Sequence, residues 1–327
     1  MKAKIAILGS HSFSGNAYAA QVLANEPCIT VSRSLELLPQ FDARLKTNFQ
    51  EQKLVWNINH DSTEIIKMLQ ENGTTTIMNF AAQSMVGQSW LNPEDWYEAN
   101  LLSLAKFVKR IRNETDVNKF VHFTTPEVYG STNGWIKENF DFAPTTPYAI
   151  SRAAGDWHLR ALFEQVDFPV IFTRAANVYG EHQQLYRIVP KVILCAFTRK
   201  KLPLQGGGKS IRSFIHISDV NKALDLIVSS GIAGESYHIS TRELVTIHEL
   251  VQKIAEYLNV ELNDLVELTP DRAGKDFAYK LDSEKIRSEL NWSDEINLGE
   301  GLKRTISWVE RNLQELEQMS TEYIHRK

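Results

Sequence analysis

Near its start the chain contains the stretch Lys4-Ile5-Ala6-Ile7-Leu8-Gly9-Ser10-His11-Ser12-Phe13-Ser14-Gly15. Its apolar part, Ile5–Leu8, is typical of a buried strand, and residues of about 14–25 have the pattern of a helix. In the turn G-x-x-S-x-x-G between them, Gly9 permits a tight bend and Gly15 lets helix and strand pack closely. A helix N-terminus placed here offers N–H groups to a pyrophosphate. The stretch therefore predicts a dinucleotide site, and its residues are Gly9, Ser12, Phe13, Ser14 and Gly15; an ordinary strand-to-helix turn is the alternative.

Strand and helix patterns alternate through the first half of the chain. Further β-rich runs lie at 29–32, 75–80, 119–123 and 170–173. Helical patterns separate them, at 63–72, 93–112 and 147–166. Strands joined by helical crossovers form a parallel sheet that has helices on both faces and binds ligands at the carboxyl ends of its strands. The fold class expected is α/β, a Rossmann-like doubly wound parallel sheet with a smaller α+β C-terminal lobe.

The pattern of alternating strands and helices ends at about residue 179, and turn-rich segments and shorter predicted elements follow. We expect residues 1–178, with a return at about 214–240, to form an NAD(P)-binding Rossmann domain. Residues of about 179–213 and 241–327 would form a substrate-binding lobe that covers the ligand edge of the sheet.

Composition excludes several classes of protein. The 327 residues are 43% hydrophobic and 23% charged, which is ordinary globular usage. The net charge of −4 leaves no basic field for nucleic acid. We see no signal peptide and no apolar run long enough to span a membrane. Only Cys28 and Cys195 are present, no cluster has metal-ligand spacing, and a cytoplasmic location fits best.

The second strand ends at Ser32-Arg33-Ser34, where NAD-binding proteins usually place an acidic residue that accepts a hydrogen bond from the ribose 2′-hydroxyl. A guanidinium flanked by two hydroxyls suits a 2′-phosphate. The sequence therefore favours NADP over NAD, and a solvent-exposed loop arginine is the alternative interpretation.

A candidate catalytic group follows the strand at 119–123, which runs into Thr124-Thr125-Pro126-Glu127-Val128-Tyr129-Gly130. Tyr148 and Arg152 come later, four residues apart on one face of a predicted helix. A fixed cation favours the phenolate and lowers the pKa of tyrosine. Such a tyrosine can take the proton of an alcohol while a hydride leaves its carbon.

These segments, taken together, resemble the extended short-chain dehydrogenases/reductases, the NAD-dependent epimerase/dehydratase family. The resemblance is greatest to the nucleotide-sugar 4,6-dehydratases of the dTDP-glucose and GDP-mannose type. It runs nearly from end to end. Besides Thr125–Gly130 and Pro147-Tyr148, the segments that carry it are Asn79-Phe80-Ala81-Ala82-Gln83-Ser84, Thr173-Arg174-Ala175-Ala176-Asn177-Val178-Tyr179-Gly180, Gly206-Gly207-Gly208-Lys209, Arg212-Ser213-Phe214-Ile215-His216-Ile217-Ser218-Asp219 and Asp271-Arg272.

The resemblance implies a role for each matching residue. Tyr148 would remove the 4-OH proton of the sugar, Thr125 would bond the same oxygen, and Glu127 would remove the C5 proton. Water would leave from C6 and the hydride would return there, so that a tightly bound cofactor is recycled. Further cofactor residues implied are Asn57, Ile58, Phe80, Ala81, Ala82, Tyr148 and Arg152. Substrate residues implied are Ser84, Thr125, Asn177, Arg187, Arg212 and Arg272.

The resemblance also implies a homodimer joined through the helices at 93–112 and 147–166. The apolar residues expected at this seam are Leu101, Leu104 and Leu159.

Three residues depart from the family pattern. Arg152 stands where the family has lysine, and it keeps the positive charge but cannot relay a proton. Pro126 stands where the dTDP-glucose enzymes have an aspartic acid, so Glu127 would serve as base and then as acid. Ser12 replaces a glycine of the turn.

Two other functions remain open from the sequence. A nucleotide-sugar 4-epimerase, or another extended enzyme of this fold, shares Tyr148 but needs no C5 base, which Glu127 argues against. A non-catalytic protein that binds the cofactor or a sugar nucleotide would explain the three departures as decay. Retention of Thr125 and Tyr148 together with Glu127 argues against that. The sequence does not identify the nucleotide or the sugar.

Overall fold

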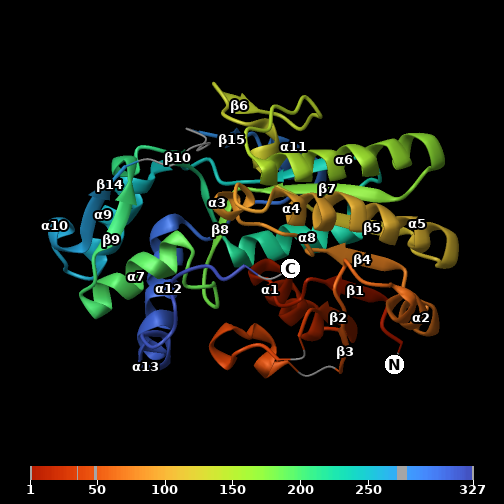
Figure 1. The fold of residues 1–327 in the computed structure, drawn as a ribbon, viewed down its shortest axis with the longest axis horizontal. Helices are drawn as coiled ribbons and strands as arrows, with labels where there is room; N and C mark the ends of the chain where they lie inside the picture. Colours follow the sequence, from red (N-terminus) through yellow and green to blue (C-terminus); the bar gives the residue numbers. More distant parts are fainter. Residues whose placement is uncertain (1, 35, 48–49, 271–277, 326–327) are drawn as a thin grey trace.

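The computed structural model describes residues 2–34, 36–47, 50–270 and 278–325 (Figure 1). Within them, a seven-stranded sheet has the strand order β12-β7-β5-β4-β1-β2-β3, and all its pairings are parallel. The strands are β1 (Ile5–Leu8), β2 (Cys28–Ser32), β3 (Glu51–Val55), β4 (Thr76–Asn79), β5 (Lys119–Phe123), β7 (Val170–Ala175) and β12 (Ser236–Ile239). This confirms the expected doubly wound α/β fold.

Helices cover both faces of the sheet because the residues of each central strand alternate between two apolar cores. Ile5 and Ile7 pack with α1 (Phe13–Leu23), α8 (Ile217–Ser230) and α11 (Glu284–Leu290). Ala6 and Leu8 point to the opposite core, which is closed by α2 (Thr63–Asn72), α5 (Leu104–Glu114) and α6 (Pro147–Val166). A strand buried on both faces reads as a continuous apolar run, which is why the sequence reveals these strands.

The helix predicted over 93–112 is interrupted in the structure. It consists of α4 (Pro93–Tyr97), the π-helical turn η3 (Glu98–Ser103) and α5. Within the wide turn, the Asn100 amide donates to Gln83 O at 3.0 Å and accepts from Gln83 N at 2.9 Å. The same amide donates to the Ser151 hydroxyl of α6 at 2.9 Å. The bulge therefore ties the segment after β4 to α6, and no local propensity signals it.

The lobe, as we call it here, lies beyond the carboxyl ends of the sheet strands (Figure 1). Its elements share one apolar cluster of their own. They include α7 (Ile188–Thr198), β9 (Leu202–Gln205), β10 (Ile211–Arg212), β13 (Val245–Thr246), α9 (Ile247–Tyr257), α10 (Leu262–Leu265), β14 (Val266–Thr269), α12 (Leu298–Arg311) and α13 (Leu313–Leu316). The chain returns to the sheet between them through β8 (Asn177–Tyr179), β11 (Phe214–His216), α8 and β12. The domain boundaries at 178, 213 and 240 stay a prediction.

At the start of α8, the sequence Ser218-Asp219 has the pattern of a helix N-cap, but neither residue is the cap. The helix begins at Ile217, and the His216 ring accepts from Ser218 N at 3.3 Å. Asp219 lies inside the first turn, fully buried, where its carboxylate accepts from Ile296 N at 2.9 Å. A carboxylate in the first turn of a helix is stabilised by the helix dipole whether or not it caps the helix. The sequence pattern therefore does not distinguish the cap position from a position inside the first turn.

None of the helices in the described part of the chain is long and apolar enough to cross a membrane. The described residues also contain no group of three or more His, Cys, Asp or Glu side chains that could together hold a metal ion. Cys28 and Cys195 are both buried as free thiols.

Candidate active site

The turn after β1 has the geometry that its two glycines predict. Gly9 has φ +76°, and a Cβ on it would lie 2.8 Å from Ala81 N, so this turn packs directly on the backbone that follows β4. A Cβ on Gly15 would lie 2.4 Å from Gly9 O. Ser12 has φ −70° and ψ 158°, which any residue adopts, and its hydroxyl caps α1 by accepting from Gly15 N at 3.1 Å. The serine in place of glycine therefore causes no strain.

A cavity of about 560 Å³ opens between this edge of the sheet and the lobe. Its floor is formed by the residues that follow β1, β4, β5 and β7, and its outer wall comes from β9 and the segments beside α7. The site residues predicted from the sequence that line this cavity are Ser12, Phe13, Ser14, Phe80, Ala82, Ser84, Thr125, Glu127, Tyr148, Arg152, Asn177, Arg187 and Arg212.

Other predicted cofactor residues lie beside the cavity and do not line it. Gly9, Gly15 and Ala81 form the packed backbone behind the turn. Ser32, Arg33 and Ser34 lie where β2 ends, and Trp56 N donates to Ser32 O at 2.8 Å, which places Asn57 and Ile58 next to them. Arg33 and Ser34 are exposed, whereas the Ser32 hydroxyl donates to Ser34 O. Arg272 lies outside the described residues.

Thr125 connects the two catalytic candidates on either side of it. It ends the segment after β5 and caps the 3-10 turn η4 (Pro126–Tyr129), where its hydroxyl oxygen accepts from Glu127 N at 3.3 Å. The same side chain hydrogen-bonds the phenol of Tyr148, which lies in the first turn of α6. Because the Thr125 oxygen already accepts from Glu127, its own proton is available to the Tyr148 oxygen.

The pKa of Tyr148 differs from the sequence-based expectation. Burial raises the pKa of this phenol above its ordinary value, although the charge of Arg152, the Thr125 hydrogen bond and the charge of Arg187 all oppose the rise. The expectation of a lowered pKa is therefore wrong for the ligand-free protein, because desolvation outweighs the neighbouring cation.

Arg152 lies beneath the cavity in a buried group of charges. Its Nη2 donates to Phe123 O at 2.6 Å and lies 3.4 Å from His122 Nε2. One turn further along α6, the Asp156 carboxylate pairs with Arg174 at 2.9 Å, and both side chains are completely buried. Asp156 thus lies among two guanidinium groups. At Tyr148 the charge of Arg152 favours the phenolate, and the charge of Glu127 opposes it. Burial and both arginines lower the pKa of His122, which adds no further charge.

The cavity wall also holds a polar residue that the sequence motifs do not reveal, Tyr279. The Tyr279 hydroxyl donates to Asn177 Oδ1 at 2.5 Å, and the Arg212 guanidinium stacks 4.4 Å from the centroid of the Tyr279 ring. Arg187 Nη2 donates to the Ser84 hydroxyl at 3.4 Å. Tyr279 belongs to none of the sequence motifs, and only the folded chain brings it to Asn177.

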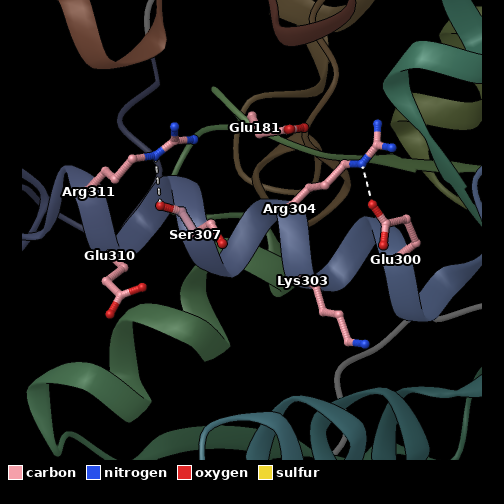
Figure 2. A pocket seen from close by; sticks show the side chains of 7 residues that line it. All are labelled: Glu181, Glu300, Lys303, Arg304, Ser307, Glu310 and Arg311. Carbon is pink, nitrogen blue, oxygen red and sulfur yellow. Dashed lines mark hydrogen bonds and ion pairs between the residues drawn. The ribbon is translucent and has the colours of Figure 1, made fainter.

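A second recess lies on the surface of α12, and unlike the cavity at the sheet edge it is not a candidate active site. Its lining residues are Glu181, Glu300, Lys303, Arg304, Ser307, Glu310 and Arg311. Figure 2 shows that Arg304 points toward Glu300, at 2.8 Å, and that Arg311 donates to the backbone oxygen of Ser307, at 3.1 Å. Three acidic and three basic side chains balance here, so the recess offers no net charge to a ligand.

A Rossmann-like sheet defines the class of NAD(P)-dependent sugar-nucleotide enzymes when Thr125, Glu127 and Tyr148 share a cavity with the turn after its first strand. The sequence matches the GDP-mannose 4,6 dehydratase family over residues 10–305, and the chain belongs to that family. The resemblance predicted from the sequence is confirmed.

Individual relatives agree with this assignment. The chain is 30% identical over 275 residues to the dTDP-D-glucose 4,6-dehydratase of Homo sapiens, covering 81% of this chain and 77% of that protein. It is 30% identical over 249 residues to a trifunctional UDP-glucose 4,6-dehydratase of Arabidopsis thaliana, of which it spans only 37%. The dTDP-glucose 4,6-dehydratase of Streptomyces venezuelae, crystallised with NAD, superposes with a TM-score of 0.87 at 27% identity. That superposition covers 95% of this chain and 98% of the other.

The buried histidine His238 gives a pH prediction. Its Nδ1 lies 3.0 Å from Asp282 O and its Nε2 lies 2.9 Å from the Tyr129 hydroxyl, which suits a neutral ring. Burial and the charge of Arg174 lower its pKa to about 3. Because the folded pKa lies below the unfolded value of about 6.5, only the unfolded chain gains this proton as the pH falls below that value.

We expect the contribution of His238 to the free energy of unfolding to fall by about 1.4 kcal/mol per pH unit from about pH 6 to pH 4. Urea unfolding of the wild type and of His238→Gln across this range measures it. The variant retains every other titrating group, so the difference between the two slopes belongs to His238. Equal slopes would show that this ring is protonated in the folded protein.

Proposed function

We propose that the protein is a nucleotide-diphosphate-sugar 4,6-dehydratase that yields a 4-keto-6-deoxy or related sugar nucleotide. The observation that carries the proposal is the convergence of Thr125, Glu127 and Tyr148 on one cavity at the dinucleotide turn. The family match and the named relatives support it.

The residues around the turn fit a nicotinamide dinucleotide. Gly9 lets the turn lie against Ala81, and the first turn of α1 presents its N–H groups toward the cavity through Phe13 and Ser14. When bound, a nicotinamide cofactor accepts a hydride and later returns it, so no net oxidant is consumed. Every other step falls to the side chains of this chain.

The proposed steps follow from the positions of the acids and bases. Tyr148 takes the proton of the sugar 4-hydroxyl, with the Thr125 proton stabilising the phenolate. Oxidation at C4 makes the C5 proton acidic, and Glu127 removes it. The 6-hydroxyl then needs a proton to leave as water. Pro126 offers none, so Glu127 gives the proton it took from C5 to the 6-hydroxyl oxygen, which leaves as water. C6 then receives the hydride, and solvent supplies the final proton at C5.

Two rival functions are weaker on the same geometry. A 4-epimerase needs no base at C5, yet Glu127 lines the cavity together with Tyr148. A binding protein without catalysis needs none of the three side chains, yet all three line the cavity and Thr125 hydrogen-bonds the phenol of Tyr148. We also propose that the enzyme is cytoplasmic, because its two cysteines are buried free thiols, and that it binds no nucleic acid.

Incubation of the purified protein with UDP-, dTDP-, GDP- and CDP-hexoses tests the function directly, because a dehydratase removes one water from its substrate. We expect Glu127→Gln to slow water loss by about 10²–10⁴-fold, since it lacks the C5 base. Hydride transfer at C4 does not need Glu127, so reduced cofactor should accumulate and absorb in the near ultraviolet. Mass spectrometry and absorbance measure the two effects.

Tyr148→Phe is the matched control, because it should abolish the reduced-cofactor signal itself. Deuterium from heavy water should enter C5 with the wild type and not with Glu127→Gln. Normal turnover by Glu127→Gln would make Glu127 a structural acid of the η4 turn and would reject the dehydratase mechanism.

We further propose that the cofactor is NADP. The solved relative from Streptomyces venezuelae contains NAD, but the end of β2 here carries Ser32, Arg33 and Ser34, with Arg33 exposed. The nearby Asp42 carboxylate accepts from Arg44 at 2.8 Å, so it is not available to accept from a ribose 2′-hydroxyl.

Arg33→Ala should weaken NADP by about ten- to a hundredfold and leave NAD nearly unchanged, because only NADP presents a 2′-phosphate to the guanidinium. Titration of cofactor-free protein with each dinucleotide measures this. Equal weakening of both, or NAD bound to the protein as purified, would contradict the assignment.

We propose a homodimer joined through the segment α4–η3–α5 and through α6. The expectation that Leu104 and Leu159 lie at the seam is wrong, because both are buried in the core between the sheet and its helices, while Leu101 is half-buried. The large apolar side chains that are exposed on these elements are Leu102 (49% exposed), Ile150 (43%), Trp157 (50%) and Val166 (44%).

Trp157→Glu should convert the dimer into monomers at micromolar concentration, since it would bury a charge in an apolar interface. Light scattering measures the mass. Ile232→Glu is the control, because Ile232 is equally exposed but follows α8 on the opposite face of the sheet. A wild type that is monomeric under these conditions would exclude the dimer.

A further inference from the structure

The segment after α13 leaves the lobe and crosses to the sheet domain (Figure 1), where His325 contacts the helix α4. The family match ends at residue 305, so this segment lies outside the shared pattern. We call residues 318–325 the tail. On one side it contacts residues that line the cavity, and on the other it contacts the segment after β4 and the helix α4.

On the lobe side, the tail contacts two residues that line the cavity. Glu322 pairs with Lys191 of α7 at 2.8 Å. The ring of Tyr323 meets the ring of Tyr186 edge to face, with centroids 5.3 Å apart and an interplanar angle of 81°. This is the favourable arrangement for an aromatic pair.

On the sheet side, the tail contacts the segment after β4 and the helix α4. The Tyr323 hydroxyl lies 3.5 Å from Gln83 Oε1. The His325 ring stacks on Trp96 at 4.9 Å and its Nε2 lies 2.8 Å from Asp95 Oδ2. Ile324, between these two anchors, is 66% exposed. The alternation is that of an extended chain with one face against the protein.

Tyr323 also lies beside the cationic part of the cavity wall. The Arg187 guanidinium is 5.5 Å from the centroid of the Tyr186 ring that Tyr323 supports, and it donates to Ser84. Burial raises the pKa of the Tyr323 phenol, and the charges of Arg33 and Arg187 oppose the rise. Tyr323 does not itself line the cavity, but it packs against Tyr186, which with the neighbouring Arg187 does.

We propose that the tail is a strap over the substrate end of the cavity and that Tyr323 is a positioning residue for the nucleotide sugar. It acts through Tyr186 and Arg187, which it holds against the cavity, and the proposal rests on the function proposed above. A recycled cofactor stays in place, so each turnover exchanges only the sugar nucleotide. The strap must open for that exchange, and its anchors are single side-chain contacts of the kind that open readily.

Tyr323→Ala should raise the KM for the sugar nucleotide about tenfold, which corresponds to loss of one well-packed aromatic contact. We expect kcat to change less than twofold, because Tyr148 and the turn at Gly9 are untouched. Tyr323→Phe keeps the ring against Tyr186 and should restore the wild-type KM. Ile324→Ala, on the outward face of the same segment, is the matched control.

The outcomes separate this proposal from the proposed function. If the wild type dehydrates a sugar nucleotide and Tyr323→Ala leaves its KM unchanged, the strap is rejected and the function stands. A loss of thermal stability at unchanged KM would also reject it, since the tail would then only stabilise the fold. If the wild type turns over no hexose of the panel, calorimetry with dTDP, UDP, GDP and CDP decides: about tenfold weaker binding by Tyr323→Ala supports the strap, and equal or undetected binding overturns it.

Discussion

The architecture depends on the close approach of three backbone segments at the carboxyl end of β1. Gly9 lies against Ala81, and Gly15 lies against Gly9 itself, at distances that leave no room for a Cβ. This contact brings the turn after β1 and the segment after β4 to one edge of the sheet. The parallel pairing of β4 with β5 then adds Thr125 and Glu127 to the same edge. The cavity exists because strand order and backbone contact converge there.

A buried electrostatic group supports that edge from below. Arg174 pairs with Asp156 and lies within 6 Å of four aromatic rings, at 5.0 Å from the Phe142 centroid and 5.9 Å from that of Phe172. A buried ion pair is costly unless its remaining hydrogen-bonding groups are satisfied. Ser236 and Thr124 satisfy part of them, whereas Asp156 Oδ1 and Arg174 Nε are buried without a hydrogen-bond partner. The group thereby places the positive charge of Arg152 under Tyr148 without exposing it to water.

The three departures from the family pattern are all accommodated by the structure. Ser12 caps α1, and Pro126 occupies the first position of η4, where a proline needs no N–H partner. Arg152 uses its longer side chain to reach Phe123 O. Each substitution has a structural partner of its own, which is unlike the loosened packing of a decaying site. Arginine at this position holds its charge permanently, so any proton that leaves Tyr148 must take another route.

The sequence alone determined the features that arise from local pattern. Buried strands read as apolar runs, and α6 occupies the residues 147–166 that the helical pattern predicts. The motif residues at the cavity floor follow strand ends, and the resemblance to the family implied them. Tertiary structure alone decided the rest: the polar edge strand β3, the bulge at Asn100, and the meeting of Tyr279 and Tyr323 with the cavity wall. Contacts between residues a hundred or more positions apart leave no periodic signal, because they depend on how elements pack and not on how each one forms.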